Sequence, residues 1–223
     1  NSLAGSILPN YAYLRNSDLT IIGEVYLRIE MNLMALPNQA MEQINEIHSH
    51  PMALLQCRKF LEQYPNVQIA ESNDTALSAK EIKENYIKHR AAIASKRAAQ
   101  LYGLDIIAAD IHDNKRNFTR FLILAPSSAK AHLPNEINKS SISFRAHHTP
   151  GSLAKVLTII GEHNINLTKI QSLPVIGEEW QYYMYADLEF EDAESYKKML
   201  KEIEPYTTSL KVLGEYKQGN KID

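Results

Sequence analysis

The sequence predicts an α/β domain followed by a smaller α+β domain of the ferredoxin-like kind. Through residues 1–126, short apolar runs alternate with segments of helical periodicity, which is typical of a layered α/β structure. A polar, proline-containing stretch then indicates a linker at residues 127–140. Beyond it, residues 141–216 show strand-like and amphipathic segments in the order βαββαβ, and residues 217–223 form a tail. We therefore predict a domain boundary inside the linker.

The composition narrows the classes of function. The 223 residues include 24 Lys and Arg against 26 Asp and Glu, for a net charge of −2. Nucleic acids and membrane surfaces normally demand a concentrated basic patch, so we expect neither, and a small-molecule partner instead. The single cysteine, Cys57, excludes an internal disulfide or a cysteine-cluster metal site and favours a reducing compartment, so we expect a cytoplasmic protein. No apolar run approaches the roughly 18 residues of a membrane span.

The opening of the first domain predicts a short helix and one long strand. Residues 1–18 are rich in Asn, Ser, Gly and Pro, which favours turns and a short helix. Apolar and polar side chains then alternate over residues 25–33, so we predict a single strand with one buried face. Pro37 ends this run, and residues 39–47 are expected to form a short helix.

A further helix is predicted to begin at Pro51, where the missing N–H of proline costs nothing. Its apolar stripe extends over residues 54–64, and Gln56 lies off this stripe. Ser49 or His50 is the expected N-cap. The N-terminus of this helix would present backbone N–H groups and a favourable dipole to an anion.

Strands and helices continue to alternate up to the last strand of the domain. Strands are predicted at residues 67–70, 91–94 and 105–109, and helices from residue 73 and over residues 95–102. This alternation places a ligand crevice at the strand ends, where the loops carry polar side chains.

The last strand of the first domain begins at residue 117. Its alternation places Asn117, Thr119 and Phe121 on one face, and Phe118 and Arg120 on the other. An amide, a hydroxyl and an aromatic ring then share a surface. Taken alone, the motif also fits an ordinary strand entry in which Thr is present for its β propensity.

The second domain is predicted to fold as a four-stranded antiparallel sheet with two helices on one face. The expected strands cover residues 141–147, 165–172, 180–189 and 210–213, and the expected helices cover residues 153–160 and 196–203.

Several short motifs carry a resemblance to a known family. They lie at residues 1–6, 49–51, 56–57, 75–76, 91–95, 102–104 and 117–121, in the family's own order. With these motifs the first domain resembles the prephenate dehydratases, and the second resembles their ACT regulatory domain. The resemblance implies a two-lobed, periplasmic-binding-protein-like catalytic domain. It also implies a lyase that converts prephenate to phenylpyruvate in phenylalanine biosynthesis, with no cofactor and no metal.

The resemblance also implies the roles of individual residues. The threonine matching Thr119 is proposed to protonate the departing oxygen. Because a free threonine hydroxyl is a poor acid, hydrogen-bond donation is an alternative role for it. The positions that match the family's substrate-binding residues, or lie in its motifs, are Asn1, Ser2, Ser49, Gln56, Thr75, Asn117, Arg120 and Phe121.

Purely structural roles stay open for several of these residues. Ser49 also fits a helix cap, Gln56 a solvated helix residue and Thr75 a first-turn residue. Arg120 fits either a bidentate partner of a substrate carboxylate or one half of a buried structural ion pair.

The second domain departs from the family in its regulatory motifs. The first motif corresponds to Gly151, Ser152, Leu153 and Ala154, and the second to Gln171, Ser172, Leu173 and Pro174. At the second motif, Gln171 replaces the family's Glu and Leu173 replaces its Arg, which removes two charges. We therefore expect weakened inhibition by phenylalanine. An ACT sheet usually buries an edge or face against a second copy, so a homodimer or homotetramer is expected.

A second departure concerns the beginning of the chain. The family normally has a Glu before the residue matching Asn1, preceded by a segment that supplies strands to the first lobe. We therefore expect an incomplete first lobe in the sequence as given. Two other activities remain open: the same lyase reaction on arogenate, and a non-catalytic sensor of small carboxylates fused to an ACT domain.

Overall fold

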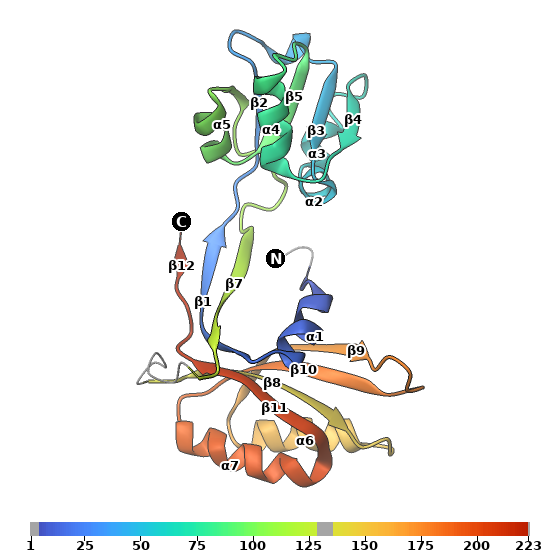
Figure 1. The fold of residues 1–223 in the computed structure, drawn as a ribbon, viewed down its shortest axis with the longest axis vertical. Helices are drawn as coiled ribbons and strands as arrows, with labels where there is room; N and C mark the ends of the chain where they lie inside the picture. The colour runs from blue at the N-terminus through green and yellow to red at the C-terminus, as the bar shows by residue number, and fades with distance from the viewer. Residues whose placement is uncertain (1–4, 129–135, 223) are drawn as a thin grey trace. The chain divides into compact units, whose positions relative to one another are not determined.

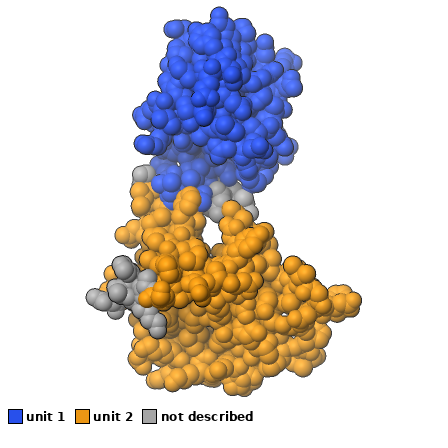
Figure 2. Space-filling model, viewed as in Figure 1, with its two compact units in different colours: residues 1–5, 27–119, 223 blue, residues 6–26, 120–222 orange. Residues whose placement is uncertain are grey.

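The computed structural model describes residues 5–128 and 136–222. These residues form two compact units, shown in Figure 2. Unit 1 contains residue 5 and residues 27–119, and unit 2 contains residues 6–26 and 120–222. The calls on Asn1 and Ser2, and on part of the linker, lie outside the described residues.

Unit 1 is built on a five-stranded sheet with the order β4-β3-β5-β2-β6. Strand β3 pairs in parallel with β4 and with β5, whereas β2 pairs antiparallel with β5 and β6. The strands are β2 (Asn32–Ala35), β3 (Glu46–Ser49), β4 (Gln68–Glu71), β5 (Arg90–Ala94) and β6 (Asp105–Ala108).

Helices cover both faces of this sheet (Figure 1). Alternate residues of β5 point to opposite faces, so Ile93 packs in the core with Leu54, and Ala92 packs in the core with Ile82. The helices are α2 (Pro51–Gln56), α3 (Arg58–Leu61), α4 (Thr75–Glu84) and α5 (Lys96–Tyr102). Gly103 ends α5 in the left-handed region, with φ of 60°, which favours glycine.

Unit 2 contains a seven-stranded sheet with the order β12-β1-β11-β8-β10-β9, in which β7 also pairs with β1. The strands are β1 (Leu19–Arg28), β7 (Phe118–Pro126), β8 (Lys139–Ala146), β9 (Asn166–Pro174), β10 (Tyr182–Glu189), β11 (Thr207–Tyr216) and β12 (Lys221–Ile222). Helices α6 (Ser152–Glu162) and α7 (Ala193–Ile203) pack on one face of β8–β11 (Figure 1). On the opposite face, Leu14 of α1 (Leu8–Asn16) packs against Tyr185 and Tyr216.

The predicted order of elements is confirmed from β8 to β11. These elements follow βαββαβ, and β8, β9, β10 and β11 form the expected antiparallel pairs with two helices on one face. In the first domain, helices at α2, α4 and α5 and strands at β4, β5 and β6 also lie where the sequence predicted them.

Three local predictions were wrong. The single strand at residues 25–33 is two strands, because the chain leaves one sheet after Arg28 and enters another at Asn32. The helix at residues 39–47 is a three-residue 3-10 turn at Met41–Gln43 followed by β3, whose pairing with two neighbours overrides local propensity. The helix from Pro51 breaks at Cys57 into α2 and α3.

The compact units also divide the chain differently from the predicted sequence domains. Most of β1, and β7 from Arg120 onward, belong to unit 2 together with the βαββαβ segment. Among the described residues, no helix is long and apolar enough to cross a membrane.

Gly214 on β11 provides a test of the parallel pairing between β1 and β11. A Cβ atom at this position would overlap the backbone oxygen of Ile21 on β1. Gly214→Ala should lower the free energy of unfolding by about 1–3 kcal/mol, because well-packed sites tolerate extra atoms poorly. Gly161→Ala on α6 is the matched control, since no heavy atom beyond its chain neighbours and the nearby backbone of its own helix lies within 4 Å of the new methyl group. Urea titration measures the stability of both variants. Equal unfolding midpoints for Gly214→Ala and Gly161→Ala would contradict this packing.

Candidate active site

A buried amide pair joins two of the predicted site residues in unit 1. Nδ2 of Asn117 donates to Oε1 of Gln56 at 2.8 Å, and the two residues are 0% and 5% exposed. The backbone oxygen of Gln56 also accepts a hydrogen bond from the N–H of Asp113 at 2.7 Å. The solvated role left open for Gln56 is therefore wrong. The apolar stripe of the helix did not predict this burial, because residues of the loop before β7 cover Gln56.

Ser49 ends β3 and is fully buried. Its hydroxyl donates to the backbone oxygen of Ile93 on β5 at 2.6 Å. The cap of α2 is His50, whose Nδ1 accepts from the N–H of Met52 at 3.1 Å. Of the two predicted caps, His50 therefore fills that role, and Ser49 ties neighbouring strands together.

The carboxyl ends of the parallel strands β3, β4 and β5 gather further hydroxyl groups. Ser72, directly after β4, donates its backbone N–H to the oxygen of Ser49 at 2.9 Å. Thr75 begins α4 behind the cap Asp74, and Ser95 caps α5 after β5. In open α/β sheets, ligands bind at this edge, outside the carboxyl ends of the strands.

Thr119 and Phe121 follow Asn117 along β7. Thr119 is half-buried and Phe121 is 48% exposed. Asn117 itself lies just before the first residue of β7, and the oxygen of Asn117 accepts from the N–H of Ile29 at 2.8 Å. The structure therefore brings Asn117 into contact with Gln56, and it places Thr119 two residues beyond that contact.

Arg120 lies in a buried group of charges in unit 2. Its Nε donates to Glu24 Oε2 at 2.5 Å, its Nη1 to Asp187 and its Nη2 to the hydroxyl of Tyr216 at 2.7 Å. Of the two roles left open for Arg120, this geometry is that of the structural ion pair.

Two lysines and a third carboxylate complete this group. Lys139 Nζ lies 3.0 Å from Glu24 and 3.0 Å from Glu189, and Lys169 Nζ lies 3.2 Å from Asp187. We call the six side chains the Arg120 cluster: Glu24, Arg120, Lys139, Lys169, Asp187 and Glu189. Its three acidic and three basic side chains balance in charge. Sequence reasoning missed the cluster, because its members are separated by up to 165 residues and share no motif.

The cluster shifts the pKa values of its members. Burial alone would raise the pKa of Asp187, but the charges of Arg120 and Lys169 outweigh it and hold this pKa below its ordinary value. Burial alone would lower the pKa values of Arg120 and Lys139, but their carboxylate partners outweigh it and raise both. All three side chains therefore stay charged at neutral pH.

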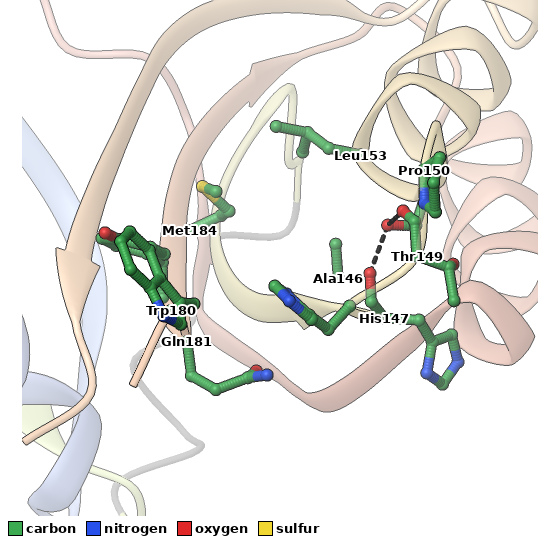
Figure 3. Close-up of a pocket in the computed structure, with 11 residues that line it drawn as sticks. Ala146, His147, Thr149, Pro150, Leu153, Trp180, Gln181 and Met184 are labelled. Atoms are coloured by element: carbon green, nitrogen blue, oxygen red, sulfur yellow. Dashed lines mark hydrogen bonds between the residues drawn. The ribbon is translucent and has the colours of Figure 1, made fainter. Parts of the chain in front are cut away.

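The predicted regulatory region contains a pocket of about 390 Å³ in unit 2 (Figure 3). Ser152 and Leu153 line it, and Gly151 adopts φ of 80° at the start of α6. Trp180 and Gln181 lie on one side of the pocket and Thr149 and Pro150 on the other. No residue of the second predicted motif, Gln171 to Pro174, is among the described residues that line it.

No group of three or more His, Cys, Asp or Glu side chains within residues 5–128 and 136–222 is arranged to hold a metal ion. Cys57 is buried, and burial raises the pKa of its thiol to about 12, so it is a poor nucleophile. The side-chain groups that Gln56 and Asn117 contribute to their contact are amides, and Ser49 contributes a hydroxyl to its bond with Ile93.

Comparison with protein families decides the classification. A model described as prephenate dehydratase matches residues 1–129, and a model described as ACT domain matches residues 140–205. The chain belongs to the prephenate dehydratase family. The family's two-lobed α/β architecture followed by an ACT domain agrees with the predicted fold class.

Curated relatives of the family are longer than this chain. The bifunctional chorismate mutase/prephenate dehydratase of Aquifex aeolicus is 38% identical over 97% of the chain and 59% of its own length. The chloroplastic arogenate dehydratase 5 of Arabidopsis thaliana is 40% identical over 97% of the chain and 55% of its own length. The chain therefore spans somewhat more than half of these prephenate dehydratase family proteins.

Solved structures show the same fold. Prephenate dehydratase from Arthrobacter aurescens, in complex with L-Phe, superposes with a TM-score of 0.84 at 26% identity, over 96% of this chain and 71% of that one. A structure described as GqqA, a novel type of quorum quenching acylase, has a TM-score of 0.80 at 28% identity. The match covers 97% of this chain and 78% of that one. The prephenate dehydratase fold thus occurs with more than one stated activity.

The Arg120 cluster makes the free energy of unfolding depend on pH. Because the pKa of Asp187 is lowered in the folded state, its contribution is fully present above its unfolded pKa of about 3.9 and is lost as pH falls through the folded pKa. Asp187→Asn should lower the free energy of unfolding by about 3 kcal/mol at pH 7, and this difference should shrink below about pH 4. Urea titrations between pH 7 and pH 3 measure it. A difference that stays constant with pH would contradict the ion pairing.

Proposed function

We propose that this chain carries prephenate dehydratase activity, the conversion of prephenate to phenylpyruvate, carbon dioxide and water. The observation that carries the proposal is the buried contact between Gln56 and Asn117, which joins two motifs of the family 61 residues apart. Membership of the family supports it, as does the gathering of Ser49 and Thr75 at the carboxyl ends of parallel strands. The catalytic portion is proposed as residues 1–126 and the ACT portion as residues 141–216, with the linker between them.

The chemistry suits a site rich in uncharged donors. As the bond from the ring carboxylate breaks, carbon dioxide leaves, and the electron pair of that bond completes the aromatic ring. The ring C–O bond breaks at the same time, and its electron pair departs on oxygen. A positioned donor that stabilises the oxygen as it gains charge accelerates the step. Thr119 is proposed as this donor, either transferring a proton or donating a hydrogen bond.

The other proposed site residues hold the dianionic substrate. Ser49, Gln56, Thr75, Asn117 and Phe121 supply hydroxyls, amides and one aromatic ring from β3, α2, α4 and the start of β7. Asn1 and Ser2 are proposed on the resemblance alone. Arg120 is proposed to act mainly through its ion pairs, because its three nitrogen atoms already bind Glu24, Asp187 and Tyr216.

Arogenate is the alternative substrate, because the curated relatives include arogenate dehydratases of similar identity. The two substrates differ by an amino group in place of a keto group. Parallel assays with prephenate and arogenate distinguish them, since the products are phenylpyruvate and phenylalanine. A sensor of small carboxylates would bind either compound without forming product.

Thr119→Ala tests the catalytic assignment. We expect kcat to fall by about 10²–10⁴ with little change in stability, because one positioned donor or acid contributes that much to a rate. The measurement is the ultraviolet absorbance of phenylpyruvate formed from prephenate. Thr158→Ala, an exposed threonine on α6, is the matched control and should leave kcat within about twofold. Near-normal turnover by a folded Thr119→Ala protein would remove Thr119 from the mechanism.

Phenylalanine is proposed as an effector at the pocket lined by Ser152, Leu153 and Trp180. Leu153→Glu places a carboxylate in the lining of this pocket and should weaken phenylalanine binding by at least about tenfold, because it repels the carboxylate of the amino acid. Trp180 is the single tryptophan, so its fluorescence reports the titration. Equal binding by the unaltered chain and by Leu153→Glu would contradict the assignment.

A further inference from the structure

The segment from Asn117 to Arg120 is held at both ends by buried polar contacts, and Thr119 lies between them. At the first end, the amide of Asn117 binds Gln56 within unit 1. At the second end, the guanidinium of Arg120 binds three partners within unit 2. Neither contact involves Thr119, yet together they restrain the backbone on both sides of it.

The contact at Arg120 is strongly directional. Planar guanidinium groups bind carboxylates in a fixed geometry, and here each of the three nitrogen atoms has its own acceptor. The acceptors come from different strands: Glu24 from β1, Asp187 from β10 and Tyr216 from β11. The position of the Arg120 side chain is therefore defined by three strands of the sheet.

Asp187 has three partners. It binds Arg120, accepts from the hydroxyl of Ser141 at 2.5 Å and pairs with Lys169 at 3.2 Å, while its side chain is only 3% exposed. Removing its charge would leave Lys169 without a carboxylate partner and would take away one of the two carboxylates that hold Arg120, which is costly and would displace Arg120.

A displaced Arg120 would turn the preceding residue. Adjacent residues of a strand point to opposite faces, so Arg120 directed into the cluster directs Thr119 to the other face of β7. Displacements of about 1 Å at a reacting group can cost about 10²-fold in rate. We propose that Asp187 and Glu24 are positioning residues, which orient Thr119 through Arg120. The kinetic part of this inference rests on the proposed function.

The test compares Asp187→Asn with Glu189→Gln in the full chain. Both changes convert an acid of the same strand and the same cluster to its amide, but Glu189 pairs with Lys139 and not with Arg120. We expect Asp187→Asn to lower kcat by about 10- to 100-fold with KM within about threefold, and Glu189→Gln to change kcat by less than about threefold. Equal losses of kcat in the two variants would overturn the proposal.

A double-mutant cycle separates positioning from general destabilisation. In a Thr119→Ala background there is no hydroxyl to position, so adding Asp187→Asn should lower the residual kcat by less than about twofold. An additive loss would show that Asp187 acts independently of Thr119, and the proposal would be wrong. Should Asp187→Asn fail to fold, Tyr216→Phe removes only the hydroxyl that binds Arg120 and Ser141, and the same cycle applies to it.

Hydrogen exchange provides a readout that needs no activity. Measured by mass spectrometry, the amides of residues 117–121 should exchange at least about threefold faster in Asp187→Asn, or in Tyr216→Phe, than in Glu189→Gln. Should the unaltered chain fail to convert prephenate, the proposed function fails, and this comparison still decides whether the cluster restrains the segment. Equal exchange rates in the variants would refute the restraint.

Discussion

The burial of Arg120 is the constraint on which unit 2 depends most. A guanidinium that leaves water must recover its hydration energy from acceptors in the protein, and each acceptor must in turn be neutralised. Glu24 and Asp187 meet the first requirement, and Lys139 and Lys169 share in the second. The strands that carry these residues can therefore pair in few other registers without leaving a charge unpaired.

Residues on the two sides of Thr119 in the sequence lie in two kinds of environment. Before Thr119, the polar groups are neutral amides, and after it they are ionised side chains. Neutral donors suit the proposed dianionic substrate, because their hydrogen bonds stabilise its charge. Paired charges suit the scaffold, because their geometry is exacting. The amides and the ionised side chains therefore suit different roles.

Local pattern predicted much of the fold. Alternation located β10, and apolar periodicity located α6 and α7, so the βαββαβ order could be predicted from residues close in sequence. The motif order likewise predicted Gln56 and Asn117 as parts of one site, and the structure joins them. The failures have a shared cause, which is long-range pairing. Strand β3 contradicts its local helical pattern because it lies between β4 and β5, and the Arg120 cluster has no sequence signature at all.

The Arg120 cluster bears on how this chain can be shortened. The composition of residues 127–138 suggests a place to cut the chain, yet a cut there would separate Arg120 and Glu24 from Lys139, Lys169 and Asp187. The isolated N-terminal portion would then carry Arg120 and Glu24 without their other charged partners. Their strands, β7 and β1, would lack the neighbouring strand β11. Deleting residues 141–216 would consequently leave a poorly folded fragment. Point changes at the pocket lined by Trp180, in contrast, leave every member of the cluster in place.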